Sequence, residues 1–232
     1  MTNTILERTK IQSGIKLQTI FGTGFIAKLG YNTNVIQKEV LLMTTKSKFT
    51  TRKIVFTALM AALTCVASAI RVTVPLDITG TTSFHLGNIF CALSGILLGP
   101  WLGGAAAGLG SLIFDIIFYP AYISECWITF LTKGAYGLIA GLIAFAGKKE
   151  VGYVKSILAT IAGAMTYAAL YLTKGYFYDG LLIGGVTPDA AWLTVLGKIP
   201  ATIFNAVVAI IFAPILAKAI SLALKKNHLN MN

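Results

Sequence analysis

Several polar and ionisable residues lie inside long apolar runs of this 232-residue sequence, where such groups need a partner or a task. Lys198, Thr202 and Asn205 follow one another at spacings of four and three, so they share one face of a helix. Lys133 and Tyr136 are spaced in the same way in an earlier run. Together they offer cations and hydrogen-bonding groups, which suit the binding of a small polar molecule.

Aromatic and ionisable residues in neighbouring apolar runs extend this pattern. A cavity with aromatic walls suits a small, flat, polar ligand that is held by stacking and a few hydrogen bonds. The predicted ligand-binding residues are Lys198, Asn205, Lys133, Tyr136, Thr202, Trp127, Tyr171, Asp115 and His85. Asp115 has an alternative role, which is to neutralise Lys133 or Lys198 in a packed bundle. The aromatic residues are also typical of a membrane-interface belt, and His85 of a satisfied helix end.

The sequence lacks the motifs of common catalytic and metal sites. The segment from Gly141 to Gly147 and Lys148 has one residue too many between its two glycines for a phosphate-binding loop. Lys149 also replaces the Ser or Thr that such a loop requires. There is no HExxH, no GxSxG and no pair of carboxylates at catalytic spacing. The three cysteines form no CxxC and are interpreted as small packing residues. We therefore expect no catalytic residue, no metal and no cofactor.

The composition is that of a polytopic membrane protein. Hydrophobic residues make up 56% of the chain and charged residues 12%, about half of the roughly 25% that soluble proteins carry. The net charge of +11 is concentrated at the termini and in one short loop, which argues against a nucleic-acid partner. The lipid bilayer is the expected environment.

Six apolar segments predict an all-α integral membrane protein built as a six-helix bundle. They cover about 54–70, 85–99, 102–119, 127–146, 154–173 and 187–221. Gly99 and Gly103, like Gly104 and Gly108, stand four residues apart, which allows close helix–helix approach. The last segment is too long for one upright span, and its prolines at 200 and 214 predict kinks.

The lysines and arginines predict the orientation in a prokaryotic plasma membrane. They gather at the same side of the predicted spans, at Lys46, Lys48, Arg52, Lys53, Lys148, Lys149, Lys155, Lys218, Lys225 and Lys226. Both termini are therefore expected in the cytoplasm, and most of the predicted ligand-binding residues in the outer half of the membrane.

Three regions are predicted. Residues 1–48 are polar and basic and form a cytoplasmic tail, or precede a true start at Met43. Residues 49–224 form the membrane domain, and 225–232 a cytoplasmic tail. Within the first span, Ala58, Ala62 and Ala61 lie on lines of small residues that favour contact with another helix, either of this chain or of a partner.

Two stretches carry a resemblance to a known family: FHLGNIFCALSGILLGPWLGGAAAGLGSLIFDII (84–117) and WITFLTKGAYGLIAGLIA (127–144). Over roughly residues 50–222 the sequence resembles the S component, the substrate-binding subunit, of energy-coupling factor (ECF) vitamin transporters. It is most similar to the branch for riboflavin, pyridoxine and hydroxymethylpyrimidine.

The resemblance implies a mechanism and partners. An S component captures a vitamin or precursor from outside, then topples in the membrane when a transmembrane coupling subunit and two ATPase subunits turn over. Ala58-xxx-Ala62 matches the motif that docks on the coupling subunit, and Arg71–Phe84, with Asp77 and Thr79–Ser83, would form a mobile polar lid. Two alternatives are a self-sufficient carrier or channel, and a membrane enzyme or assembly factor that uses Lys133, Lys198 and Asp115.

Overall fold

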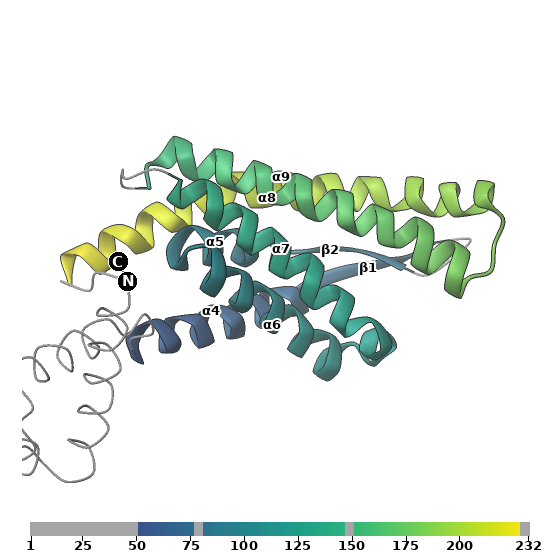
Figure 1. Ribbon diagram of the computed structural model, residues 1–232, viewed down its shortest axis with the longest axis horizontal. Helices are drawn as coiled ribbons and strands as arrows, with labels where there is room; N and C mark the ends of the chain where they lie inside the picture. Colours follow the sequence, from purple (N-terminus) through teal and green to yellow (C-terminus); the bar gives the residue numbers. More distant parts are fainter. Residues whose placement is uncertain (1–50, 77–80, 147–150, 228–232) are drawn as a thin grey trace, which may run out of the picture. The chain divides into compact units, whose positions relative to one another are not determined.

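The computed structural model describes residues 51–76, 81–146 and 151–227, which form six α-helices and a β-hairpin (Figure 1). The predicted tail of residues 1–48 with Met43, the lid residues Asp77 and Thr79, and residues 228–232 lie outside the described residues. In chain order the elements are α4 (Thr51–Ala69), β1 (Arg71–Pro75), β2 (Thr81–His85), α5 (Gly87–Leu98), α6 (Pro100–Phe118), the 3-10 helix η1 (Pro120–Glu125), α7 (Cys126–Phe145), α8 (Tyr153–Lys174), the π-helix η2 (Gly175–Ile183) and α9 (Pro188–Lys226).

The prediction of an all-α membrane bundle is confirmed. Within the described residues, five helical stretches are long and apolar enough to cross a membrane, and they contain α4, α6, α7, α8 and α9. The sixth apolar helix, α5, has 12 residues and is therefore about 18 Å long, too short for a hydrocarbon core of about 30 Å. The long helix α9 opens as predicted, with Thr187 as its cap and Pro188 in its first turn.

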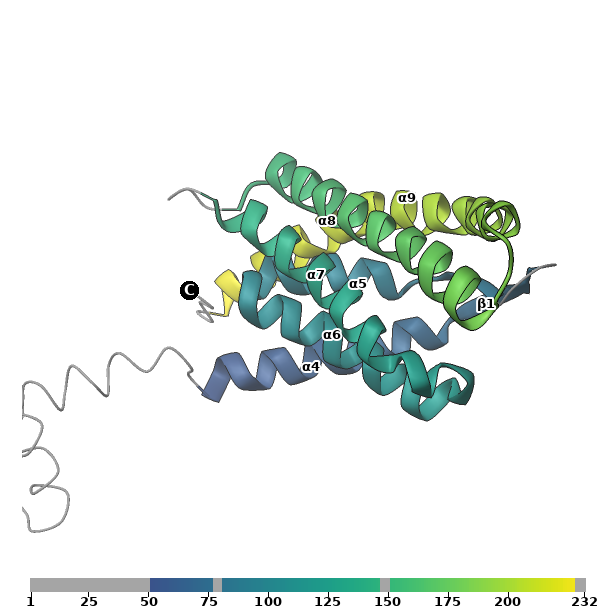
Figure 2. The same ribbon diagram turned by 45° about the vertical axis from the view of Figure 1, so that its right-hand side comes forward.

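The stretch between the first two helices is not the loop that the sequence predicts. β1 and β2 pair as antiparallel strands, with Arg71 opposite His85 and Pro75 opposite Thr81. Five of the ten strand residues are β-branched valines or threonines, and such side chains favour extended backbone. In both views the hairpin runs from the bundle toward the end where η2 joins α8 to α9 (Figure 1, Figure 2).

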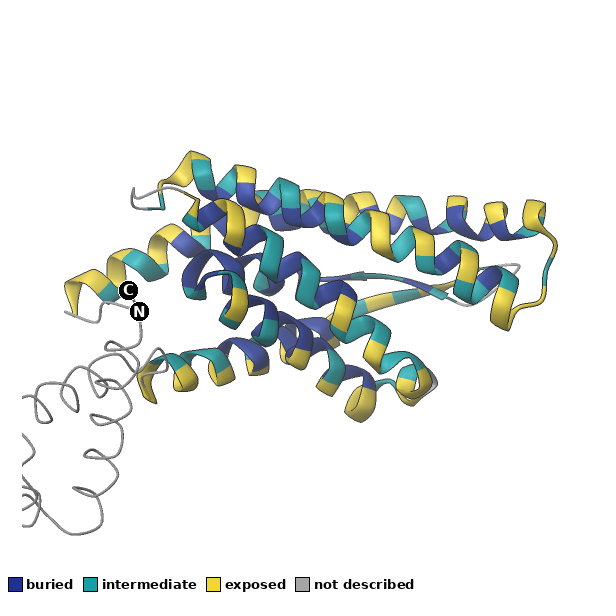
Figure 3. Cartoon of the chain, in the orientation of Figure 1, coloured by how far each residue is buried: buried dark blue, intermediate teal, exposed yellow. Residues whose placement is uncertain are grey.

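Helix α5 forms the centre of the packing. It lies against α4, α6, α7, α8 and α9, and ten of its twelve residues are buried (Figure 3). Small residues allow the helices to pack this closely around α5. Gly103 of α6 faces Gly95 of α5, and Gly104 and Gly108 of α6 face the backbone of α7. At the bend between α5 and α6, Gly99 has φ 81°, a conformation that favours glycine. The predicted glycine pairs therefore do bring helices together.

The predicted change of direction in α9 is visible in the described part of the chain. Pro200 and Pro214 both lie inside the helix, and Pro214 is buried. The yellow C-terminal part of α9 runs in a different direction from the part before it (Figure 1). A proline removes one hydrogen bond from the helix, which is a common cause of such a kink.

We expect Gly110→Ala to lower the free energy of unfolding by about 1–3 kcal/mol, the usual cost of overpacking. The added methyl would collide with the backbone carbonyl oxygen of Ala61 in α4. Gly134→Ala is the matched control, because the nearest atom to its methyl would be 3.5 Å away. The measurement is the thermal unfolding midpoint of the full-length protein in detergent. Equal midpoints for the two variants would contradict close packing of α4 and α6 at Gly110.

Candidate functional site

A cavity of about 90 Å³ lies where the hairpin meets the ends of α6, α7 and α8 and the first half of α9. Its lining is unusually rich in ionisable groups for the interior of a membrane bundle. The lining residues are Arg71, Thr82, Ser83, His85, Asp115, Tyr122, Glu125, Ile128, Thr129, Thr132, Lys133, Tyr167, Tyr171, Lys174, Asp179, Lys198, Ala201, Thr202 and Asn205.

Seven of the nine predicted ligand-binding residues line this cavity, and they come from five elements. They are Lys198, Asn205, Lys133, Thr202, Tyr171, Asp115 and His85. The other two lie elsewhere. Trp127 is 55% exposed on the surface of α7, and Tyr136 is fully buried in the core beside Gly163 of α8. Nothing in this arrangement brings Trp127 or Tyr136 to the cavity wall.

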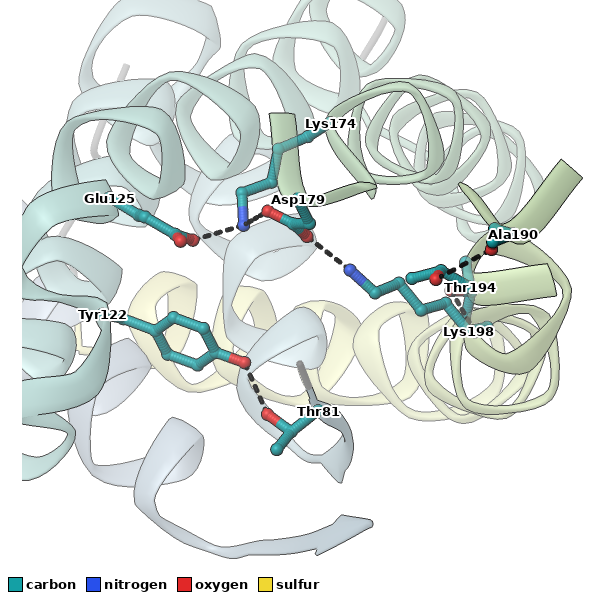
Figure 4. Close-up of polar contacts among 9 residues, drawn as sticks. Thr81, Tyr122, Glu125, Lys174, Asp179, Ala190, Thr194 and Lys198 are labelled. Atoms are coloured by element: carbon teal, nitrogen blue, oxygen red, sulfur yellow. Dashed lines mark hydrogen bonds and ion pairs between the residues drawn. The ribbon is translucent and has the colours of Figure 1, made fainter. Parts of the chain in front are cut away.

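A chain of opposite charges crosses the cavity (Figure 4). Lys174 contacts Glu125, and its Nζ lies 2.8 Å from Asp179 Oδ1. The second carboxylate oxygen of Asp179 accepts from Lys198 Nζ at 2.5 Å. The four residues come from η1, α8, η2 and α9, so this Glu125–Lys174–Asp179–Lys198 chain ties four elements together. Within the described residues Asp115 has no cation within ion-pair distance, and the counter-charge of Lys198 is Asp179.

The π-helix η2 places Asp179 between the two lysines. Its backbone is wider than an α-helix, and such segments are frequent at functional sites. Beside it, the hydroxyl groups of Thr81 in β2 and Tyr122 in η1 are hydrogen-bonded at 2.7 Å. The hairpin is therefore held against the same rim as the charge chain (Figure 4).

Lys133 is 5% exposed and has no carboxylate within ion-pair distance among the described residues. Its Nζ donates to Asn88 Oδ1, lies 3.5 Å from His85 Nε2 and stands 4.1 Å from the centre of the Tyr167 ring. His85 lies in β2, and its Nε2 faces Lys133. Neutral imidazole can accept a hydrogen bond from Lys133.

Asn205 and Thr202 are occupied within the protein. The side chain of Asn205 accepts from the backbone N–H of His85 at 2.9 Å and donates to the backbone oxygen of Ser83 at 2.8 Å. It therefore ties α9 to β2 and positions the hairpin. The hydroxyl of Thr202 donates to the carbonyl oxygen of Lys198, one turn earlier in its own helix.

Sequence reasoning missed several residues of the wall. Arg71, Glu125 and Asp179 stand at the ends of apolar runs and are absent from the predicted ligand-binding residues. Arg71 instead folds inward, and its guanidinium lies 4.1 Å from the centre of the Phe114 ring. The position of these charged residues at the ends of apolar runs was visible in the sequence. A long charged side chain at such an end can fold back into the bundle or face water.

Comparison with known proteins gives two findings. The sequence model of a family described as ECF-type riboflavin transporter, S component, matches residues 48–222. A relative from Pyrococcus woesei, described as an uncharacterized protein in a gap 3′ region, is 30% identical over 119 residues. This alignment covers 51% of the present chain and 74% of the relative.

We expect Asp179→Asn to lower the free energy of unfolding by about 1–3 kcal/mol, because two mostly buried lysines lose their shared carboxylate. The loss is smaller than for a fully buried pair, since Lys174 keeps Glu125. Asp189→Asn is the matched control: Asp189 is exposed in the first turn of α9, so its change should cost less than about 1 kcal/mol. Thermal unfolding in detergent measures both, and equal shifts would contradict a structural role of the charge chain.

Proposed function

Because this chain belongs to the family of ECF-type riboflavin transporter S components, we propose that it captures a vitamin or vitamin precursor with a flat heteroaromatic ring. Riboflavin, pyridoxine and hydroxymethylpyrimidine are the proposed candidates. The observation that carries the proposal is the convergence of seven sequence-predicted polar and aromatic residues on one cavity in the bundle. Nothing in this role requires catalysis, a cofactor or a metal.

The chemistry of the wall fits a flat ring with polar edges. Tyr167 and Tyr171 are stacked with their centres 5.6 Å apart, and a cation stands over each ring: Lys133 at 4.1 Å from Tyr167 and Lys198 at 5.3 Å from Tyr171. Aromatic faces bind a ring by stacking, and ammonium groups donate to its carbonyl or ring-nitrogen acceptors. Lys133, which has no carboxylate within ion-pair distance in the described part of the chain, is the proposed primary donor. Asp115 is a proposed acceptor for ring N–H or hydroxyl groups.

For a ligand to enter, side chains that line the cavity have to move. At about 90 Å³ the cavity is smaller than the roughly 300–1,000 Å³ of typical ligand pockets. The Glu125–Lys174–Asp179–Lys198 chain and residues of the hairpin both line it. We infer that a ligand displaces part of this chain, so that its own polar groups replace protein–protein ion pairs.

Delivery to the cytoplasm is proposed to follow the family mechanism. The cavity faces outward and both termini face the cytoplasm, as the distribution of lysines and arginines predicts. The subunit then topples in the membrane as the coupling subunit and two ATPases turn over. The proposed docking residues on α4 are Ala58 and Ala62, which are exposed. Ala61 is 7% exposed and lies against Gly110 of α6, so it does not belong to that surface.

Uptake into proteoliposomes separates this function from its alternatives. The purified chain alone should bind a vitamin without concentrating it inside, and uptake should require the coupling subunit, the ATPases and ATP. Accumulation by the chain alone would favour a self-sufficient carrier. Chemical conversion of the ligand would favour a membrane enzyme.

We expect Lys133→Met to weaken ligand binding by about tenfold or more, because the ligand loses a hydrogen bond from a buried, charged donor. The control is Lys155→Met, at the far end of α8, which should leave binding unchanged. Calorimetric titration of the detergent-solubilised protein with the three candidate ligands, without nucleotide, measures this. Binding of none of them would contradict the proposed function, whereas equal affinity in both variants would remove Lys133 from the site.

We expect Ala58→Trp and Ala62→Trp to abolish assembly with the coupling subunit and leave ligand affinity intact, because a bulky ring prevents close helix approach on that face. Leu158→Trp on α8, at a site that is 55% exposed, is the control for a new tryptophan in the lipid-facing surface. Co-purification with the tagged coupling subunit measures assembly. Normal assembly of both α4 variants would rule out this docking face.

A further inference from the structure

Two charged residues of the cavity wall, Arg71 and Asp115, lie outside the Glu125–Lys174–Asp179–Lys198 chain. Asp115 belongs to α6 and is 4% exposed. Thr129 of α7 interacts with its carboxyl group, but the buried Oδ2 atom makes no hydrogen bond to any of the described residues. A buried oxygen without a partner carries a desolvation cost, which a ligand that donates to it relieves.

The fold holds the guanidinium group of Arg71 against α6 at the level of Asp115. It lies 4.1 Å from the centre of the Phe114 ring and 5.3 Å from that of the Tyr119 ring. Phe114 directly precedes Asp115, and Tyr119 follows it by four residues, about one helical turn. The Nε atom of Arg71 donates to the backbone oxygen of Ser68 at 2.9 Å. The N–H groups on its two terminal nitrogens make no hydrogen bond within the described residues.

Arg71 and Asp115 are neighbours that do not satisfy each other. Their charges lie close enough to interact, but no ion pair joins them in the described part of the chain. An ionised carboxylate only accepts hydrogen bonds, and a guanidinium group only donates them. A ligand edge that meets both groups therefore has to donate to Asp115 and accept from Arg71. The pair selects an edge that carries an N–H donor beside an acceptor.

The three candidate ligands differ in this edge. Hydroxymethylpyrimidine has an amino group next to a ring nitrogen, so a fixed donor stands beside a fixed acceptor. Riboflavin has a ring N–H between two carbonyl groups, but on a system of three fused rings. Pyridoxine offers hydroxyl groups, each of which can donate or accept, and so has no fixed donor beside a fixed acceptor.

The volume of the cavity separates the first two candidates. At about 90 Å³ the cavity is much smaller than typical ligand pockets, so its wall has to move for any of them. A single ring requires less of this movement than three fused rings. Every ion pair of the charge chain that a ligand separates lowers the net affinity, because the separated charges lose their partners. The smaller ring is therefore favoured.

We propose that Asp115 and Arg71 determine the specificity of the cavity, and that they select a single ring of the aminopyrimidine class. Asp115 Oδ2 accepts from the amino group, and the guanidinium group of Arg71 donates to the adjacent ring nitrogen. This inference rests on the proposed function and adds to it the pair of residues that distinguishes one ring edge from another. Lys133 remains a donor to an acceptor elsewhere on the ring.

The test compares two pyrimidines, hydroxymethylpyrimidine and its analogue with hydrogen in place of the amino group. Calorimetric titration of the full-length protein in detergent should show about tenfold or tighter binding of the amino compound, the effect of one hydrogen bond to a charged group. Asp115→Leu should remove this preference, and Asp115→Asn should keep part of it, because an amide oxygen still accepts. Arg71→Met should weaken both pyrimidines about equally, since both retain the ring nitrogen.

Glu125→Gln is the matched control, because it removes the same charge from the same cavity at a residue whose partner is Lys174. This variant should retain the preference for the amino compound. A full preference in Asp115→Leu, or a loss of preference in Glu125→Gln as well, would overturn the role of Asp115. Unchanged affinity of both pyrimidines in Arg71→Met would overturn the role of Arg71. Thermal unfolding of the ligand-free variants shows whether each is folded, and the two ligands are also compared on the unsubstituted protein.

Titration with all three candidate ligands separates a failure of this inference from a failure of the proposed function. Binding of none of them would overturn both. Tighter binding of riboflavin or pyridoxine than of hydroxymethylpyrimidine would overturn the choice of an aminopyrimidine and leave the vitamin-binding function standing. Equal affinity of the unsubstituted protein for the two pyrimidines would have the same consequence.

Discussion

A charge inside a membrane bundle must be compensated within the protein, and this constraint accounts for the candidate site. Lys174 and Lys198 share one carboxylate, Asp179, and Glu125 completes the chain. Because the four residues belong to four elements, neutralising the charges also fixes those elements relative to one another. In the proposed function the same ion pairs occupy space that a ligand needs, so the stability of the ligand-free form and the proposed affinity for a ligand oppose each other through the same contacts.

The short central helix explains where this chemistry can be placed. With 12 residues, α5 is about 18 Å long against a hydrocarbon core of about 30 Å, and the β1–β2 hairpin directly precedes it in the chain. The hairpin strands carry backbone polar groups, and Asn205 of α9 satisfies two of them in β2 through both of its amide atoms. Polar backbone at membrane depth is tolerated where protein encloses it. The cavity lies beside this enclosed backbone.

Small residues allow α5 to be so thoroughly covered. Where Gly95, Gly103 and Gly137 meet, three helices approach at backbone distance, and lipid could not replace those contacts. A side chain at any of these positions would separate the helices and widen the bundle. The dense packing at one end of α5 and the polar cavity at the other are thus two consequences of one arrangement.

The sequence by itself determined the membrane class, the helix positions to within a few residues, the family resemblance and seven residues of the cavity wall. The membrane class, the helix positions and the seven wall residues follow from hydropathy and helical period, which are local properties, whereas the resemblance rests on the stretches 84–117 and 127–144. Only the tertiary structure decided the partner of each charge. It paired Lys198 with Asp179 rather than Asp115, gave Asn205 the task of holding β2, and turned Trp127 outward and Tyr136 into the core. The helical periodicity of the sequence predicts which face of a helix a residue occupies. The side chain that it contacts depends on how the other helices pack in space, which no local sequence pattern encodes.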